Sequence, residues 1–93
     1  MEKKIMCKCE NLIVEELDEG VIILNNDDGY THVLNGMGGF IWTNIVNNQS
    51  KEENIKNIIN QINDFDKYTK EDVYNYCSDF MDMLIEKKLI KLI

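Results

Sequence analysis

The chain has 93 residues, of which 44% are hydrophobic, and such a chain can build one domain around one hydrophobic core. Its ten basic residues are all lysines and are outnumbered by 17 acids, so the formal net charge is -7. This balance excludes nucleic acid as an expected partner, because phosphate binding needs clustered positive charge and base recognition favours arginine. A basic peptide is the partner that such a surface would attract.

No apolar run is long enough for a signal peptide or a membrane span, so the sequence predicts a cytoplasmic protein without a membrane partner. Three cysteines, an odd number, fit a reducing compartment. Cys7 and Cys9 provide too few thiolates for a tetrahedral metal site, and we expect neither a metal nor a cofactor. Their role stays open between packing and oxidation. We expect one domain over residues 1–93, with residues 1–10 as a flexible N-terminal segment.

Three short runs of β-favouring residues come first in the chain, at residues 12–14, 21–24 and 30–34. Residues 18–20 and 25–29 separate them and are rich in Asp, Asn, Glu and Gly, most of which tolerate turn dihedrals. Connections this short join antiparallel neighbours. The sequence therefore predicts a three-stranded antiparallel meander.

A helical period follows the third run. A first helix is predicted over residues 36–46, with Asn35 as its cap and Trp42 as a large core anchor. A second helix begins at Ser50, whose spacing to Glu53 is that of a capping box. Its isoleucines are spaced for one buried face: Ile55, Ile58, Ile59 and Ile62.

The third predicted helix has a similar capping start, from Thr69 to Asp72, and reaches Lys87. Its core stripe repeats every three or four residues and contains Val73, Tyr76, Cys77, Phe80 and Leu84. A second apolar line, formed by Tyr74, Met81 and Ile85, lies about 100° further around the helix, with Ser78 beside it. Either both flanks of this helix are covered internally, or one flank is a groove for a partner.

No catalytic machinery is visible in the sequence. His32 is the only histidine, and no serine or cysteine lies at a spacing that suggests a paired nucleophile. Paired acids such as Asp27 and Asp28 are typical of turns, not of two carboxylates facing across a cleft. The glycine-rich run at residues 36–39 lacks the Lys-Ser or Lys-Thr pair of a phosphate loop. We therefore expect that the protein is not an enzyme.

The most specific signal is the run Leu-Asn-x-x-Gly-x-x-Ile-Trp, formed by Leu34, Asn35, Gly38, Ile41 and Trp42. A second pattern follows later in the chain, formed by Phe80, Met81, Leu84 and Leu89. Together the two patterns resemble the pyrroloquinoline quinone biosynthesis protein D (PqqD) family, and residues 11–90 can be laid on that family's pattern. Members usually carry an acid where Tyr76 stands and a glycine where Lys88 stands.

This resemblance implies an α+β, winged helix-turn-helix-like domain, in which a three-stranded antiparallel sheet is followed by three helices. It also implies a stand-alone RiPP recognition element, a peptide chaperone that binds the leader of a ribosomally synthesised precursor peptide. Such a protein presents the leader to a modifying enzyme, often a radical S-adenosylmethionine (SAM) protein. In the family, the leader adds as a further strand beside the third strand and packs against the third helix.

A physical argument indicates the same place, because an edge strand has unpaired N–H and C=O groups that an extended peptide can fill. The residues predicted to bind the peptide are Tyr30, Thr31, His32, Val33 and Leu34 on the strand, and Tyr74, Ser78, Met81 and Ile85 on the third helix. Which flank of the helix lines the groove stays open. We expect a Met81→Asp change to weaken binding without unfolding the domain.

Two other classes of function stay open. The first is a winged-helix DNA-binding regulator, which the acidic helices and the absence of arginine disfavour. The second is a non-catalytic subunit that stabilises a larger enzyme, or a homodimer formed by pairing of the same edge strand. The sequence identifies neither the precursor nor the partner enzyme.

Overall fold

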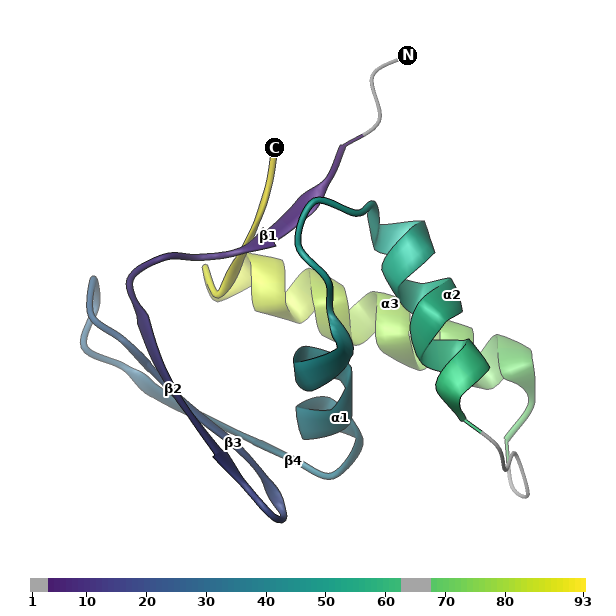
Figure 1. Cartoon of the computed structure of the whole chain (residues 1–93), viewed down its shortest axis with the longest axis horizontal. Coiled ribbons are helices and arrows are strands. Elements are labelled where there is room, and N and C mark those ends of the chain that lie inside the picture. Colours follow the sequence, from purple (N-terminus) through teal and green to yellow (C-terminus); the bar gives the residue numbers. More distant parts are fainter. Residues whose placement is uncertain (1–3, 63–67) are drawn as a thin grey trace.

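The computed structural model of the protein describes residues 4–62 and 68–93. Its strands and helices are, in chain order, β1 Met6–Lys8, β2 Leu12–Leu17, β3 Gly20–Asn25, β4 Thr31–Asn35, α1 Met37–Asn44, α2 Lys51–Gln61, α3 Lys70–Glu86 and β5 Ile90–Leu92. Strands β2, β3 and β4 form an antiparallel meander, and the three helices of the described chain follow it (Figure 1). The predicted α+β class and winged-helix-like order of elements are confirmed.

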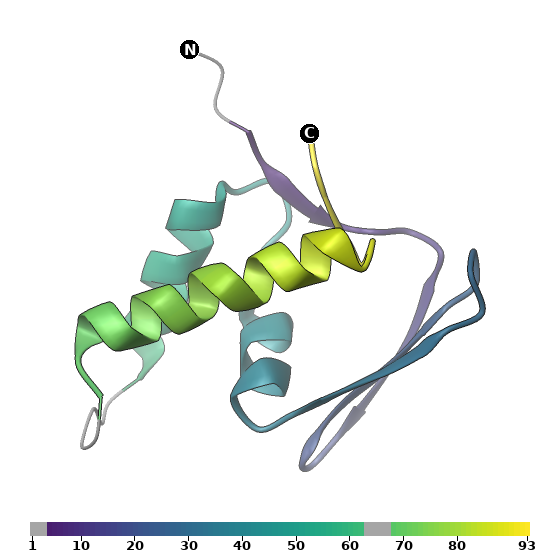
Figure 2. The ribbon, with the colours of Figure 1, turned by 180° about the vertical axis from the view of Figure 1, so that it is seen from behind.

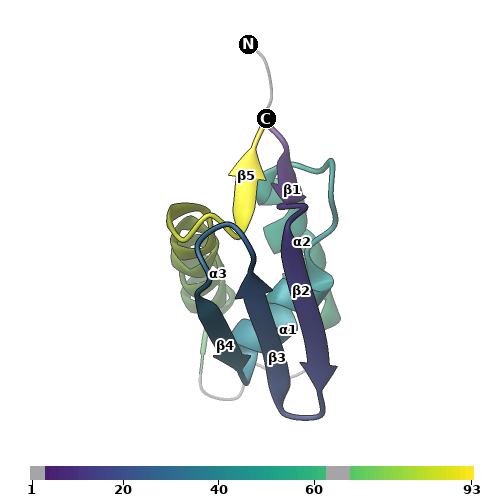
Figure 3. The same ribbon diagram turned by 90° about the vertical axis from the view of Figure 1, so that its left-hand side faces the viewer.

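The meander buries one face against the helices. Val21 lies opposite Leu34 and Ile23 opposite His32, so these side chains share one face of the sheet. Val21, Ile23 and Leu34 are buried there, where α1 packs on β3 and β4. Among the described residues, strand β4 pairs only with β3, and it forms the edge of the sheet nearest α3 (Figure 3).

Both predicted capping boxes are present. At the start of α2, the Ser50 hydroxyl accepts a hydrogen bond from the Glu53 amide at 3.1 Å, and the Glu53 carboxylate accepts one from the Ser50 amide at 3.3 Å. Thr69 and Asp72 make the same two bonds at the start of α3. Each box satisfies backbone N–H groups that the first helical turn leaves free, which is why these two helix starts could be located from the sequence.

The start of α1 differs from the prediction. Its N-cap is Gly36, which has a φ of 55°, and no side chain caps the helix. Asn35 is instead the last residue of β4. The expectation that Asn35 caps the helix was wrong, because the sharp turn from strand to helix uses a positive φ that glycine adopts without strain. Helix α1 also ends at Asn44, two residues before its predicted end.

Glycine lets α1 approach the sheet closely. A Cβ atom on Gly39 would lie 2.8 Å from the carbonyl oxygen of Leu34, a distance that a side chain does not tolerate. Trp42 is almost fully buried in the core, as predicted, and the Lys8 ammonium lies 4.8 Å from the centre of its ring. Burial in this position lowers the pKa of Lys8, although the nearby carboxylate of Glu16 acts in the opposite direction.

The N-terminal segment is an integral part of the fold. Strand β1 pairs antiparallel with β5, and the fully buried side chain of Met6 belongs to the core. The backbones of Ile5 and Ile93 exchange hydrogen bonds of 3.2 and 2.9 Å, so both ends of the described chain lie side by side (Figure 2). The expected flexibility of residues 1–10 was therefore wrong for the described part of that segment, while residues 1–3 lie outside the described residues.

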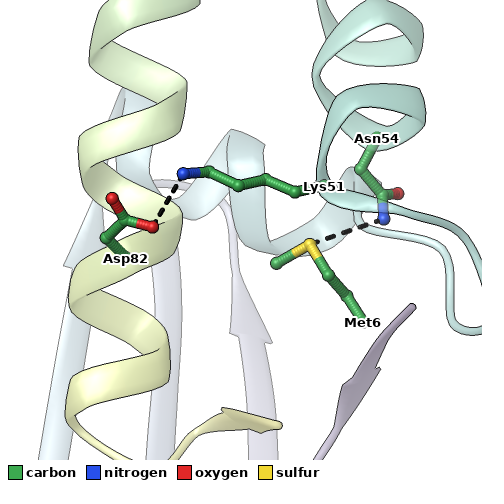
Figure 4. A network of polar contacts seen from close by, with 4 residues as sticks. All are labelled: Met6, Lys51, Asn54 and Asp82. Carbon is green, nitrogen blue, oxygen red and sulfur yellow. Dashed lines mark hydrogen bonds and ion pairs between the residues drawn. The ribbon is translucent and has the colours of Figure 1, made fainter. Parts of the chain in front are cut away.

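A buried polar side chain joins α2 to the connection that follows α1. Asn54 is fully buried, and its Oδ1 accepts a hydrogen bond from the Val46 amide at 2.7 Å. Its Nδ2 donates to the carbonyl oxygens of Val46 and Ser50 at 3.2 and 3.3 Å, and lies 3.8 Å from the sulfur of Met6 (Figure 4). Asn54 thus provides hydrogen-bond partners for both the amide and the carbonyl of Val46 and holds this connection against α2.

Candidate functional site

The free edge of β4 is the first component of the candidate site. Two hydrogen bonds bracket the strand: the Asn25 amide donates to the Tyr30 carbonyl at 3.0 Å, and the Gly36 amide donates to the Glu19 carbonyl at 3.4 Å. In an antiparallel ladder, alternate residues direct both backbone groups toward the neighbouring strand. Residues 30, 32, 34 and 36 therefore bond toward β3. The N–H and C=O groups of Thr31, Val33 and Asn35 point away from the sheet.

The two edges of the meander differ in charge. Strand β2, at the far edge, carries Glu15 and Glu16, and charged side chains on an edge strand discourage pairing with another chain. Strand β4 contains no charged residue. Of the two edges, β4 is therefore the one open to an added strand.

An aromatic flank of α3 is the second component. The Phe80 ring lies against α1, since a Cβ atom on Gly38 would be 2.9 Å from the ring. Tyr76 stacks on Phe80, with ring centres 6.2 Å apart and planes 9° apart, and half of the Tyr76 surface is exposed. Met83 follows at helical spacing on the same flank and is partly buried. We call β4 together with this flank of α3, formed by Tyr76, Phe80 and Met83, the β4–α3 groove.

The groove has a hollow at each end. At the end near the start of β4, a cavity of about 350 Å³ is lined by Asp28, Tyr30, Thr31, His32, Glu86, Lys87 and Lys88. At the other end, the described lining residues are Met37, Tyr68, Asp72, Val73 and Tyr76. The first hollow is polar and carries both signs of charge, whereas exposed aromatic side chains dominate the second.

The predicted strand residues lie together at this groove. Tyr30, Thr31 and Val33 are exposed, and Leu34 is buried beneath them in the core. His32 is half-buried, and its Nε2 atom is buried without a hydrogen-bond partner. Leu34 thus supports the strand from below, while the other four residues line the surface or the first hollow.

The predicted helix residues lie elsewhere. Met81 is fully buried in the core, which corrects the expectation that it lines the groove and that an aspartate there would leave the domain folded. Lys51 of α2 pairs with Asp82 at 2.7 Å, so that side of α3 faces α2 (Figure 4). Tyr74, Ser78 and Ile85 lie between the core face and Asp82 around the helix, on the flank opposite to Tyr76.

The flank of Tyr76, Phe80 and Met83 was not among the residues predicted from the sequence to bind the peptide. Tyr76 and Phe80 were assigned to the core stripe, and Met83 was not singled out. The available signal was Gly38, because a glycine in the first turn of α1 leaves room for a large ring from another element. It does not specify which ring fills that space.

The site offers hydrogen bonds and apolar contacts. Burial raises the pKa of the Cys77 and Cys9 thiols, which keeps both thiols protonated at neutral pH. The third thiol, that of Cys7, lies 3.4 Å from Asn48 Oδ1. None of the described residues form a group of metal-ligating side chains. No helix in the described ranges is long and apolar enough to cross a membrane.

Comparison with known proteins adds one structural likeness. Neither a described protein family nor a curated protein matches the sequence, so the resemblance to the PqqD family rests on its motifs alone. Among solved structures, the chain is similar to TbiB1 in complex with the TbiA(beta) leader peptide, with a TM-score of 0.72 and 20% sequence identity. The match covers 90% of this chain and 93% of the TbiB1 chain, and it shows that the two share a fold.

Proposed function

We propose that this protein binds the leader of a ribosomally made precursor peptide, as an extra strand along β4 in the β4–α3 groove. One observation carries the proposal: the edge of β4 has outward backbone groups at Thr31, Val33 and Asn35 and lies nearest α3, where Phe80 packs against α1 and half of the Tyr76 surface is exposed. Strand addition of this kind takes affinity from main-chain hydrogen bonds and specificity from alternate side chains.

The likeness to TbiB1 supports this proposal. TbiB1 was solved in complex with a leader peptide, and its likeness to this protein extends over nearly the whole of both chains. On this proposal the protein is a stand-alone peptide chaperone and not an enzyme. It acts in the cytoplasm and presents the leader to a modifying enzyme, for which a radical SAM protein is our candidate.

The groove suggests the chemistry of the peptide. Alternate side chains of an added strand would face Tyr76, Phe80 and Met83, which favours apolar or aromatic residues at those positions. Asp28 and Glu86 stand at the first hollow and favour a basic residue at that end, although Lys87 and Lys88 lie beside them. The net charge of -7 would steer a basic leader to the protein.

A titration with the leader of the precursor encoded beside this gene tests the proposal. We expect binding in the micromolar range or tighter, and slowed hydrogen exchange at the amides of Thr31, Val33 and Asn35. The amides of β2 should not change. Absence of binding at about 50 µM, which corresponds to a free energy of about -6 kcal/mol, would contradict the proposal.

Two tyrosines of α3 provide a matched pair of variants. Tyr76→Asp places a charge on the groove flank and should weaken leader binding by at least about tenfold, because it removes an exposed aromatic contact. Tyr74→Asp places the same charge on the opposite flank and should change affinity by less than about twofold. Circular dichroism checks that both variants remain folded. Equal effects of the two substitutions would show that the peptide does not bind at the flank of Tyr76.

Self-association through the same edge is a competing possibility. Size-exclusion chromatography with and without the leader separates the two, because a homodimer paired through β4 would dissociate as the leader binds. A gel shift at low salt addresses the DNA-binding alternative, which the five acids of α3 continue to disfavour.

A further inference from the structure

The net charge of the protein is concentrated in one part of the fold. Between residues 10 and 36, which cover the meander and its turns, seven acids occur and no lysine: Glu10, Glu15, Glu16, Asp18, Glu19, Asp27 and Asp28. The remaining ten acids of the chain are balanced by its ten lysines. Residues 10–36, of which Glu10 precedes the meander, therefore carry a charge equal to the whole formal net charge of -7.

Only part of this charge is compensated locally, by Lys91 near Glu10 and by Lys8 near Glu16. Glu10 lies 3.9 Å from Lys91, and both side chains are exposed, so the pair is weak. Glu15, Asp18 and Glu19 form no ion pair with any other described residue. These three acids lie on β2 and its turn into β3, where their negative charge is not balanced by an ion pair with a described lysine.

The outer face of the meander is largely apolar, with Glu15 in its middle and Thr31 and Asn35 along its β4 edge. In the register of the sheet, Ile13 lies beside Leu24, and Ile22 lies between Glu15 and Val33. Because side chains alternate along a strand, these residues and Leu17 point away from the helices. Ile13, Leu17 and Val33 are 56%, 51% and 59% exposed. Figure 3 looks onto this outer face, and the helices lie behind it.

From this combination we infer that the outer face, formed by Ile13, Leu17, Ile22, Leu24 and Val33, docks a protein partner with an apolar patch surrounded by lysine and arginine. A contiguous apolar surface on a small domain marks an interaction site. The acids around it select the charge of the partner, since like charges across an interface cost several kcal/mol and opposite charges accelerate association.

The same charges argue against other occupants. A second copy would bring a second sheet with six acids and no lysine against the first, with Glu15 in the middle of each face. A membrane surface rich in anionic lipid would be repelled in the same way. A basic protein surface is the occupant that satisfies both the apolar area and the surrounding acids.

This face is compatible with an occupied groove. The backbone groups of Val33 point along the sheet, toward the free edge, whereas its side chain stands on the outer face. A peptide added at the edge would extend the outer face without covering it. If the proposed function holds, the partner is the enzyme that acts on the bound peptide; the identity of the partner rests on the proposed function, whereas the docking surface does not.

Binding of the purified enzymes encoded beside this gene, each measured by calorimetry, tests the inference. We expect one of them to bind, more tightly at about 50 mM than at about 500 mM salt, because added salt screens the acids. Replacing Ile13 and Leu17 together by serine should weaken binding by at least about tenfold. Glu15→Lys should weaken it by about fivefold at low salt and much less at high salt.

Two matched controls lie away from this face. Val46→Ser removes a comparably exposed aliphatic side chain in the connection between α1 and α2, and Glu52→Lys reverses an exposed acid on α2. Both should leave the affinity unchanged within about twofold. Leader binding is measured with the same variants to separate the two claims. If the protein binds the leader but none of the enzymes, this inference is wrong and the proposed function is unaffected. A protein that docks an enzyme but binds no leader overturns only the proposed function.

Three results would overturn the inference. The first is that no encoded enzyme binds at about 50 µM. The second is that binding is indifferent to the serine and Glu15→Lys substitutions. The third is a dimer in sedimentation, or association with anionic vesicles, that the double serine variant abolishes, because the face would then be occupied by a second copy or a membrane.

Discussion

Lys88 adopts a left-handed backbone conformation just after the last helix, with a φ of 63°. The amide of Lys88 donates to the carbonyl of Ile85, and the amide of Leu89 donates to that of Leu84, both at 3.0 Å. This is a Schellman motif, which most often has glycine at the left-handed position. A lysine in this left-handed conformation has a steric cost, because its Cβ atom crowds the backbone. The glycine usual at this position in the PqqD family fits the same geometry.

Lys88→Gly should therefore stabilise the protein by about 1 kcal/mol, because glycine removes the cost of a left-handed lysine. Urea denaturation monitored by circular dichroism measures the change. Lys87→Gly is the control: its φ is -79°, so glycine brings no relief there and should cost about 0.5–1 kcal/mol. A lower stability of the Lys88→Gly variant would contradict the left-handed assignment.

Asn54 is expected to contribute to stability, since its fully buried side chain bonds both the amide and the carbonyl of Val46. Asn54→Ala should lower the free energy of unfolding by about 2–4 kcal/mol, because the amide and carbonyl of Val46 lose their partners. The exposed Asn57 on the same helix provides the comparison, and Asn57→Ala should cost less than about 0.5 kcal/mol. Similar losses in both variants would remove the special role of Asn54.

At the scale of elements, the direction of the Val33 amide leads to a test of strand addition. Val33→Pro removes an N–H group that points away from the sheet, so the pairing of β3 with β4 keeps its hydrogen bonds. The variant should remain folded and bind the leader at least about tenfold more weakly. Val33→Ala retains the amide and should bind within about threefold of the parent. Fluorescence anisotropy with a labelled leader distinguishes these outcomes, and undiminished binding by the proline variant would exclude pairing at this edge.

The sequence predicted those elements whose signals are local. Capping boxes at Ser50 and Thr69 located two helix starts, and short turns between β-favouring runs predicted the meander. It could not decide between the two flanks of α3, because a helix sequence gives the angular order of its side chains but not the direction from which β4 approaches. That direction depends on the turn at Gly36 and on the space that Gly38 leaves for Phe80.

The pairing of β1 with β5 was missed for a related reason. Each strand has three residues, and Met6 and Leu92 lie opposite one another although nearly the whole chain separates them. Strands this short show no alternation from which a partner can be recognised. The burial of Met6 was equally invisible, because a single methionine near a terminus is typical of an exposed segment.

At the scale of the whole molecule, β1 should be required for stability. A chain without residues 1–9 loses the fully buried side chain of Met6 and the partner of β5, and its free energy of unfolding should fall by at least about 3 kcal/mol. Removal of residues 1–4 alone should have little effect, since Lys4 is exposed and precedes the pairing. Thermal unfolding of both shortened chains measures the difference, and equal stability would contradict the role of β1.

The pairing of β1 with β5 also makes the domain suitable for insertion into another protein. The backbones of Ile5 and Ile93 are paired, and Figure 3 shows β1 and β5 side by side at the end of the molecule above the meander. A domain with adjacent ends can be placed inside a surface loop of a host protein, because the two flanking host residues need hardly separate. The fold is thus suited to serve as a cassette, carried within or beside a larger protein while its β4 edge remains accessible.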